Sequence, residues 1–422
     1  MRKKFLSVLL GVLLLGTLTG CQNNASDDVT AGNDTNVTDE VTEDGPIPLT
    51  VWAEEDNFTM LEGMIENFKK QYSSEEFEIT LTVQSDAGLR DVLLGDVLSG
   101  PDVFHFPDDQ LNSLIAGGVL GEVPNASEVK AANTAASVDA ASLNGTLYAY
   151  PMTADNGYFL YYNKDYFTEE DVKTLDGVLA AAEKAGKKFS MELNSGWYMY
   201  AFFGNTGMQF GLNEDGVTNY CTWNTTEGDI TGVDVAESIM NMIASPAFLS
   251  SGDGTFIENA KAGEVIAAIS GVWNAMSVKE TWGDDYGAVK LPTFTCKGQQ
   301  IQMSSFTGYK MVGVNSYSEN VEWAHKFAEF ITNEENQTVR FVERNQGPSN
   351  IKAAASDEVL KVPAIQAVIA QSEFGVLQRV GNNFWTPCTE FANVLIEGNP
   401  DNTPIQELLD TLVAGITAST VK

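Results

Sequence analysis

The first part of the chain shows two patterns of apolar residues, which predict strands and helices in alternation. Apolar and polar residues alternate over 47–52 and again over 77–83, and each stretch predicts a strand. Between them, apolar residues over 61–72 recur every three to four positions, as in an amphipathic helix. The Thr59-x-x-Glu62 pattern just before this stretch predicts a capping box at the start of the helix.

The alternation of strand and helix continues up to about residue 116. The patterns predict a helix over 89–98 that Gly100-Pro101 ends, a buried strand over 102–106 and a helix over 111–116. This order indicates an α/β fold with a mainly parallel sheet and helices on both faces. Ligands of such sheets bind beyond the carboxyl ends of the strands, so 52–58 and 106–109 are candidate binding segments.

A second structural unit is predicted from about residue 147 onward. Its expected elements are strands over 159–162 and 265–269, helices over 176–185 and 235–243, and a mainly helical part from residue 323 to the end. The 377 residues after Gly45 are too many for one average domain and suit two.

The N-terminus has the features of an export signal. Arg2-Lys3-Lys4 precedes an apolar run over 5–15, which is shorter than the roughly 20 residues that span a bilayer. This predicts a signal peptide over 1–20. The Leu18-Thr19-Gly20-Cys21 tetrad resembles a bacterial lipobox, which implies a lipid anchor such as palmitate on Cys21 and a mature chain on the outer face of the cytoplasmic membrane. The alternative is an ordinary signal peptide with an incidental cysteine.

Residues 21–45 are predicted to be a disordered, acidic linker that lifts the domain off the membrane. The whole chain carries a net charge of −34, and the three bases of the leader and seven acids of the linker leave −30 on the rest. A surface this acidic repels nucleic acid, so no nucleic-acid partner is expected.

Cysteine and histidine usage argues against metal and enzyme chemistry. Besides Cys21 there are three cysteines, an odd number that leaves at least one free thiol, and no CxxC or Cys/His metal spacing occurs. Neither of the two histidines lies near a convincing Ser or Cys partner, and no GxSxG, P-loop or HExxH motif is found. We therefore expect no cofactor, no metal and no catalysis.

The order of segments resembles the extracytoplasmic solute-binding proteins of ABC importers, most closely the maltose/maltodextrin-binding branch. The segments that carry the resemblance are Leu49-Thr50-Val51-Trp52, Gly100-Pro101-Asp102-Val103-Phe104, Asn144-Gly145-Thr146-Leu147-Tyr148-Ala149-Tyr150-Pro151, Tyr162-Asn163-Lys164-Asp165, Gly271-Val272-Trp273, Tyr286-Gly287, Leu291-Pro292-Thr293-Phe294 and Phe384-Trp385.

This resemblance implies a two-lobed periplasmic-binding-protein fold (type II) with the ligand in a cleft between the lobes, which close by a hinge. The implied N-terminal lobe comprises 46–153 and 308–362, and the C-terminal lobe comprises 154–307 and 363–422. The implied function is capture of malto-oligosaccharides and their delivery to an ABC permease, by a protein that is monomeric.

The resemblance also implies a set of sugar-binding residues. Aromatic rings stack on the C–H faces of sugars, and ionised side chains form the stronger hydrogen bonds with the hydroxyls. The implied set is Trp52, Asp56, Asn57, Phe106, Asp109, Asp155, Trp197, Tyr198, Trp273 and Trp385. Three polar positions differ from the family pattern, since Asn57 replaces a lysine, Gln110 an arginine and Gly196 a glutamate.

Other interpretations of these residues and of the function stay open. The tryptophans at 223, 282 and 323 are assigned to packing, and Trp52 is as compatible with the core as with a site. A β-linked oligosaccharide or a peptide are alternative ligands, and an extracellular glycan-active enzyme is the alternative from another class. An amino-acid or phosphate site is disfavoured because the arginines are scattered.

Overall fold

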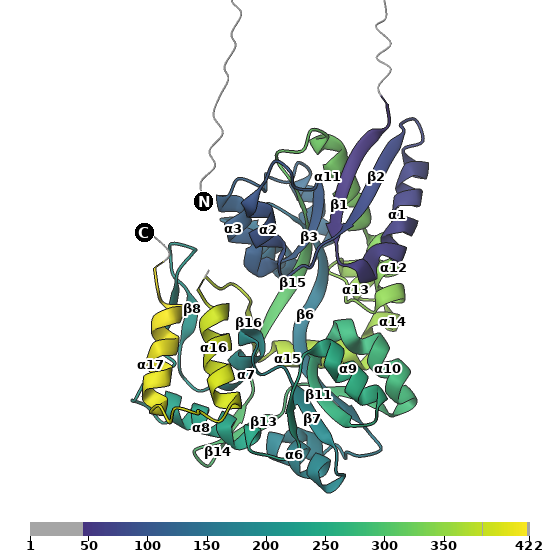
Figure 1. The fold of residues 1–422 in the computed structure, drawn as a ribbon. Coiled ribbons are helices and arrows are strands. Elements are labelled where there is room, and N and C mark those ends of the chain that lie inside the picture. Colours follow the sequence, from purple (N-terminus) through teal and green to yellow (C-terminus); the bar gives the residue numbers. More distant parts are fainter. Residues whose placement is uncertain (1–44, 382, 420–422) are drawn as a thin grey trace, which may run out of the picture. The chain divides into compact units, whose positions relative to one another are not determined.

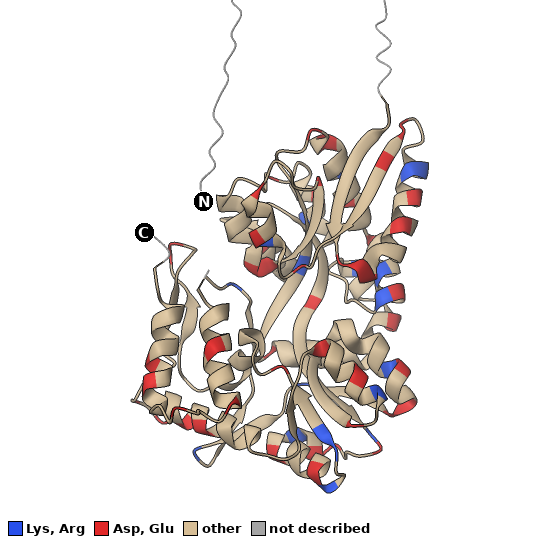
Figure 2. Cartoon of the chain, viewed as in Figure 1, with Lys and Arg blue, Asp and Glu red and all other residues tan. Residues whose placement is uncertain are grey.

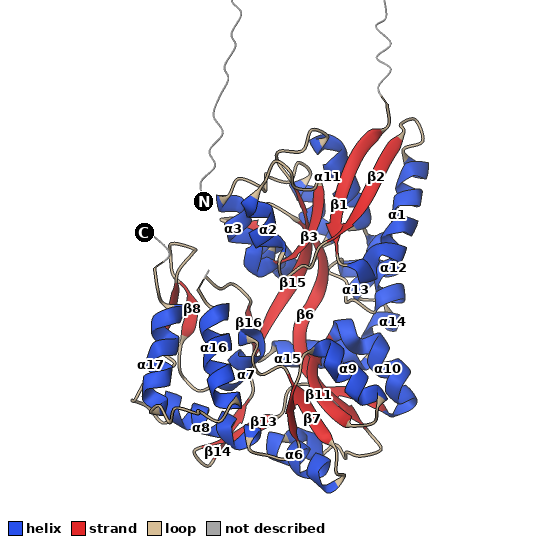
Figure 3. Cartoon of the chain, viewed as in Figure 1, coloured by secondary structure: helices blue, strands red, loops and turns tan. Residues whose placement is uncertain are grey.

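The computed structural model describes residues 45–381 and 383–419, so the predicted signal peptide, Cys21 and linker residues 21–44 lie outside the described part. The described chain is built around one sheet that runs through two halves (Figure 1, Figure 3). Its strand order is β10-β7-β11-β6-β15-β3-β1-β2, with β12 added to β6 and β16 added to β15. The alternating strands and helices that the sequence predicts for residues 47–116 are confirmed.

Each half of the sheet has its own parallel strands. The strands of the first half are β1 (Ile47–Ala53), β2 (Phe77–Val83) and β3 (Val103–Pro107), and those of the second half are β7 (Lys188–Met191), β10 (Phe248–Ser250) and β11 (Val265–Gly271). Two longer strands, β6 (Tyr150–Asn163) and β15 (Ser305–Val314), pair antiparallel with each other and belong to both halves. The remaining strands are β12 (Tyr286–Val289), β16 (Gly375–Leu377) and the small pairs β4 (Ser142–Leu143) with β5 (Thr146–Leu147), β8 (Phe210–Leu212) with β9 (Asn219–Cys221), and β13 (Thr293–Cys296) with β14 (Gln299–Gln302).

Helices surround each half of the sheet (Figure 1). The helices are α1 (Phe58–Gln71), α2 (Leu89–Gly95), α3 (Leu111–Ala116), α4 (Ala126–Ala132), α5 (Ala135–Ala140), α6 (Leu175–Lys184), α7 (Gly196–Phe203), α8 (Gly232–Ile243), α9 (Asp253–Lys261), α10 (Ala275–Trp282), α11 (Val321–Ile331), α12 (Glu334–Arg344), α13 (Ile351–Ala354), α14 (Asp357–Leu360), α15 (Pro363–Ser372), α16 (Trp385–Ile396) and α17 (Ile405–Ile416). Short 3-10 turns are η1 (Glu55–Asn57), η2 (Asp108–Gln110), η3 (Asp171–Lys173), η4 (Val272–Asn274) and η5 (Gly283–Asp285). None of the helices in the described part of the chain has the length and apolarity needed to cross a bilayer.

Separate hydrophobic cores support the two halves. The first core contains the buried side chains of β1 and β3, of β6 up to Met152, and of β15 from Met311. The second half has a core on each face of its sheet, because successive residues of β6 point to opposite sides. Tyr158 and Leu160 belong to one of these cores, whereas Phe159 and Tyr161 belong to the other.

Most of the middle of β6 and β15 lies outside these cores, although Tyr309 packs partly buried against the first core. Residues 153–157 of β6 and 307–310 of β15 lie between the cores and include several polar side chains. The pairing of the two strands is irregular here, with register shifts on both sides of Lys310. Such irregularities redirect side chains and are common beside functional sites.

Two details of the sequence prediction are wrong. The helix predicted after the first strand begins at Phe58, and its N-cap is Asn57 without a side-chain cap, so Thr59 lies inside the helix. The 3-10 turn η1 runs directly into this helix, and the Asn57 side chain instead accepts a hydrogen bond from Arg340 at 3.5 Å. The helix predicted over 89–98 already ends at Gly95.

Charged side chains are spread over the helices of both halves, with acids outnumbering bases (Figure 2). The three tryptophans assigned to packing lie in the cores or against them: Trp223 and Trp282 are buried, and Trp323 packs partly buried against the first core. That assignment is confirmed.

Candidate ligand-binding cleft

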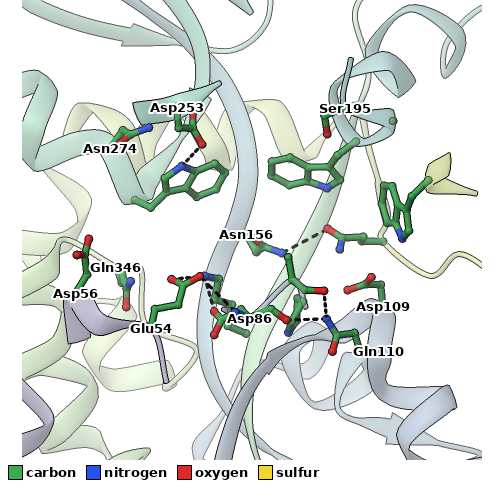
Figure 4. Close-up of a pocket in the computed structure, with 18 of the residues that line it drawn as sticks. Glu54, Asp56, Asp86, Asp109, Gln110, Asn156, Ser195, Asp253, Asn274 and Gln346 are labelled. Atoms are coloured by element: carbon green, nitrogen blue, oxygen red, sulfur yellow. Dashed lines mark hydrogen bonds and ion pairs between the residues drawn. The ribbon is translucent and has the colours of Figure 1, made fainter. Parts of the chain in front are cut away.

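A cavity of about 600 Å³ lies where the two halves of the sheet face each other (Figure 4). Its volume is within the range of about 300–1,000 Å³ that is usual for small-molecule sites. Its lining comes largely from segments that follow the carboxyl ends of parallel strands, as expected for open α/β sheets. These are Glu54 after β1, Asp86 after β2, Asp109 after β3, Ser195 after β7, Asp253 after β10 and Trp273 after β11.

One side of the cavity, formed by the first half, is rich in charge. The Lys310 ammonium of β15 lies 2.8 Å from Asp86 Oδ2 and 3.9 Å from Glu54 Oε2. Burial alone would lower the pKa of Lys310, but the two carboxylates outweigh it and raise that pKa, so the lysine stays charged. Burial raises the pKa of Glu54, and Lys310 opposes that rise. Asp86 is nearly fully buried and its Oδ1 has no partner among the described residues.

Asp109 and Gln110 continue this polar side (Figure 4). Gln110 donates to the backbone carbonyl oxygens of Asp86 at 2.7 Å and Ala87 at 3.2 Å, and accepts from the Arg90 amide at 3.0 Å. Burial raises the pKa of Asp109 to about 7, although Arg90 and a hydrogen bond from Gln378 act in the opposite direction. The Asp109 Oδ1 atom is shielded from solvent and unpartnered among the described residues.

The crossing strands and the segment after β16 close the cavity at its middle. Asn156 of β6 lies between the two sides of the cavity (Figure 4) and donates to Gln378 Oε1 at 3.4 Å. Gln378 is itself fixed by its backbone amide, which donates to Thr307 of β15 at 2.8 Å. Amide side chains are therefore presented by two of the segments that link the halves.

The opposite side of the cavity consists mainly of three tryptophans. Trp197 at the start of α7 and Trp273 in η4 have ring centroids 5.5 Å apart, with planes inclined by 38°. Trp385, at the start of α16, lines the same cavity and packs on Phe384 at 4.9 Å. Tyr158 supports Trp197 from behind at a centroid distance of 4.7 Å, and its hydroxyl donates to the Trp197 carbonyl at 2.8 Å.

One ion pair and one hydrogen bond organise the rim. Arg344 at the end of α12 lies 3.1 Å from Asp56, which is largely exposed. Gln346 accepts from the buried Arg340 guanidinium at 3.1 Å. Both cations that line the cavity, Lys310 and Arg344, are thus within ion-pair distance of carboxylates.

The structure brings five of the predicted site residues into one cavity. These are Asp56, Asp109, Trp197, Trp273 and Trp385. They come from both halves of the fold, so stacking and acidic groups from distant segments line one cavity. Their role in binding a sugar stays a prediction.

The other five predicted residues do not line the cavity. Phe106 and Tyr198 are buried in the two main cores, and Trp52 packs partly buried against the first core. Asn57 is buried beside Arg340, and Asp155 of β6 is buried, where its Oδ2 accepts from the Gly347 amide. These residues could affect a ligand only indirectly, by holding neighbouring residues that do line the cavity.

Several lining residues were not singled out from the sequence. They are Glu54, Asp86, Asn156, Ser195, Asp253, Asn274, Lys310, Arg344, Gln346, Gln378 and Thr389. Lys310 did carry a signal, because it is a lone cation within an apolar strand pattern. Asp86 also comes three residues after a predicted strand, whereas Asp253 follows a three-residue strand that is too short to recognise.

The departure from the family pattern at Gly196 has a steric cause. A Cβ atom built on Gly196 would lie 2.7 Å from the Cβ of Cys388 and 3.4 Å from the Trp385 ring. The missing side chain lets the start of α7 approach α16 closely. A glutamate at this position would clash with Cys388 of α16.

The three cysteines of the described residues, Cys221, Cys296 and Cys388, are free thiols. No group of three or more His, Cys, Asp or Glu side chains within residues 45–381 and 383–419 is arranged to hold a metal ion.

The fold and cleft are those of a two-lobed periplasmic-binding-protein class, each lobe a mainly parallel sheet flanked by helices. The family described as bacterial extracellular solute-binding protein matches residues 63–367, which is more than half of the chain. The chain belongs to this family, which confirms the resemblance drawn from its sequence segments.

Individual relatives agree with this assignment. The galactooligosaccharide-binding protein of Bacillus subtilis (strain 168) is 28% identical over 84% of this chain and 85% of its own length. The maltooligosaccharide ABC transporter solute-binding lipoprotein of Streptococcus pneumoniae serotype 4 is also 28% identical, over 76% of this chain and 77% of its own. A solved structure with acarbose has a TM-score of 0.80 and 26% identity, and the match covers 88% of this chain and 99% of that one.

Asp109 makes stability depend on pH in a defined direction. Its folded pKa, about 7, lies above the value of about 4 for an unfolded aspartate, so ionisation costs stability as pH rises from about 4 to 7. Asp109→Asn should therefore stabilise the ligand-free protein at pH 8, by on the order of 2 kcal/mol, and have little effect at pH 4. Urea unfolding of both proteins at the two pH values measures this difference.

The exposed carboxylate of Asp215 provides a control with the opposite sign. A hydrogen bond from Thr218 lowers the pKa of Asp215, so Asp215→Asn should lose stability relative to the wild type as pH rises. An equal effect of Asp109→Asn at pH 4 and pH 8 would contradict the assigned pKa.

Proposed function

We propose that this protein is the lipid-anchored, substrate-binding component of an ABC importer that captures α-linked gluco-oligosaccharides in the cleft and performs no chemistry. The observation that carries this proposal is the wall of three tryptophans, Trp197, Trp273 and Trp385, facing a wall of carboxylates and amides. Aromatic faces suit the C–H faces of sugar rings, and carboxylates suit their hydroxyl donors. A cleft with both surfaces fits a polyhydroxylated chain.

The charge balance of the cleft supports a neutral ligand. Lys310 and Arg344 already have carboxylate partners, so an anionic ligand would have to compete with Asp86 and Asp56 for them. The unpartnered oxygens of Asp86 and Asp109 need hydrogen-bond donors, and sugar hydroxyls supply these. This argues against phosphate or amino-acid ligands and for a sugar.

The inclination between Trp197 and Trp273 favours a bent chain over a flat one. Two platforms at 38° to each other contact successive rings only if the ligand turns between them. α-1,4-Linked glucans curve in this way, whereas β-1,4-linked chains run nearly straight. A β-linked galacto-oligosaccharide is the second candidate, because one relative is named a galactooligosaccharide-binding protein.

Isothermal titration against an oligosaccharide panel tests the proposal. The panel contains maltose, maltotriose, longer maltodextrins, galacto-, xylo- and cello-oligosaccharides. We expect the maltodextrins to bind and affinity to rise with length until the three tryptophans are covered. Binding of galacto-oligosaccharides alone would leave the transport role and overturn the α-glucan assignment. Absence of binding to every sugar would refute sugar capture, and release of reducing ends would establish an enzyme.

Alanine at the cleft tryptophans should remove affinity without unfolding the protein. Trp197→Ala and Trp385→Ala are expected to weaken maltotriose binding at least about tenfold, or ~1.4 kcal/mol, because each removes a stacking face. The matched controls are Trp323→Ala, which removes a partly buried tryptophan outside the cleft, and Trp223→Ala.

The two controls should behave differently from the cleft variants. Trp323→Ala should bind maltotriose normally. Trp223 stacks on Phe203 at 4.3 Å within the core, so Trp223→Ala should cost about 3–5 kcal/mol of stability. Cleft variants that unfold like Trp223→Ala and bind sugar when folded would assign those tryptophans to packing instead.

Delivery to a permease depends on anchoring, which we attribute to Cys21. We propose that the monomer docks on its permease with the lobes 46–153 plus 308–362 and 154–307 plus 363–422 closed on the sugar. Cys21→Ala should abolish palmitate labelling, release the protein from the membrane and slow uptake of the bound sugar. Membrane retention of Cys21→Ala with unchanged labelling would show that another element anchors the chain.

A further inference from the structure

Trp273 is held on one face by the backbone beneath it. Its ring lies so close to Gly271, the last residue of β11, that a Cβ built there would be 2.0 Å from the ring atoms Cη2 and Cζ3. Only glycine leaves room for this contact. The benzo part of the indole is therefore held against the backbone of β11, and the ring also lines the cavity.

The edge of the same ring is fixed by a carboxylate. The Trp273 indole N–H donates to Asp253 Oδ2 at 2.7 Å, and Ser270 Oγ donates to Asp253 Oδ1 at 2.6 Å. Asn274 in turn donates to Ser270 Oγ at 2.9 Å. Both carboxylate oxygens are thus engaged by groups of the protein. Figure 4 shows Asp253 and Asn274 on the same side of the cavity, away from Glu54 and Asp86.

The contact with Trp197 extends this restraint to a second platform. Tyr158 packs against the Trp197 ring, and that ring meets Trp273 at 5.5 Å and 38°. With Trp273 pinned on a face and at an edge, the angle between the two indoles is set before any ligand binds. Pre-organised side chains lose less entropy on binding, which appears as affinity and selectivity.

We propose that Asp253, together with Gly271, is a positioning residue that sets the plane of Trp273 and thereby selects oligosaccharides that bend between adjacent units. This inference rests on the proposed sugar-binding function and adds to it a determinant of linkage selectivity. Asp253 acts through the indole N–H of Trp273 rather than by taking a sugar hydroxyl itself.

A double-mutant cycle separates these two roles. Asp253→Ala should weaken maltotriose binding by about tenfold and narrow the preference for maltotriose over a β-linked trisaccharide. In a Trp273→Ala background the same change should alter affinity by less than about twofold, because the group that it positions is gone. Effects that multiply in the double variant would mean that Asp253 binds the sugar directly, which would overturn the proposal.

Two further substitutions test the clamp separately at the carboxylate and at the backbone. Asp253→Asn keeps an oxygen for the indole N–H and should retain binding within about threefold. Gly271→Ala keeps Asp253 but pushes the ring away, and should weaken binding about as much as Asp253→Ala. Full affinity in Gly271→Ala would contradict a fixed ring plane.

A measurement on the ligand-free protein distinguishes failure of this inference from failure of the proposed function. The difference between the near-ultraviolet circular dichroism of the wild type and Trp273→Ala reports the ordered indole. The near-ultraviolet spectrum of Asp253→Ala should therefore come close to that of Trp273→Ala, while its far-ultraviolet spectrum stays that of the wild type. An unchanged near-ultraviolet spectrum would overturn the clamp even if sugars bind. The expected loss, with no sugar bound by the wild type, would uphold the clamp and refute the function.

The matched control is Asp234→Ala in the same half of the fold. Asp234 forms the capping box of α8 with Thr231, outside the cleft. This variant should lower the melting temperature and leave both the tryptophan spectrum and maltotriose affinity unchanged. A change of affinity as large as that of Asp253→Ala would mean that general destabilisation explains both.

Discussion

The pairing of β6 with β15 is the constraint on which the rest of the structure depends. The ends of both strands are fixed by packing, those of β6 in all three cores and those of β15 in two of them, while most of their middle residues lie outside the cores. A strand segment without a core on either face can keep polar side chains such as Asp155, Asn156 and Lys310. The cleft lies at this gap, and the register shifts beside Lys310 are consistent with its side chain reaching Asp86 at the cavity. The crossing between the halves and the cavity are thus consequences of one arrangement.

The free-energy cost of burying charged groups in the cleft is partly offset by ion pairs and hydrogen bonds within the protein, without a ligand. Lys310 is paired with Asp86 and near Glu54, and Asp253 accepts from Ser270 and Trp273, so these groups are held in place without sugar. Burial still raises the pKa of Asp253 and Asp109, which means that desolvation is only partly compensated. Some of these carboxylate oxygens, such as Oδ1 of Asp109, have no partner among the described residues. A ligand hydroxyl that donates to such an oxygen would remove the cost of leaving it unpaired, so its hydrogen bond would contribute most to binding.

Local periodicity predicted the α/β elements of the first half, whereas the two-lobed fold and the site were predicted through the family resemblance. Strands β1, β2 and β3 and helices α1 and α3 followed from alternation and helical spacing, because those patterns report which face meets a core. Trp197 and Trp385 were predicted through the resemblance to the family, and both line the cavity. Asn57, Asp155 and Tyr198 also occupy positions of the family pattern, yet they are buried. Asn57 accepts a hydrogen bond from Arg340, Asp155 accepts one from the Gly347 amide, and Tyr198 packs on Tyr158. Such competition involves residues distant in sequence, which no local pattern contains.

The polar departures from the family pattern are explained by what each replacement contacts. Gln110, in place of an arginine, bonds to the backbone of Asp86 and Ala87 and so shapes the floor of the cleft. Gly196, in place of a glutamate, admits the α16 residues that carry Trp385. Hydrogen-bonding capacity in the cleft is supplied instead by the amides Asn156 of β6 and Gln378 after β16, while Asp253 holds Trp273. Because these amides sit where the halves join, ligand recognition and lobe closure would draw on the same side chains. A ligand that satisfies both walls would then stabilise the closed arrangement by its differential contacts, which is what a hinged binding protein requires.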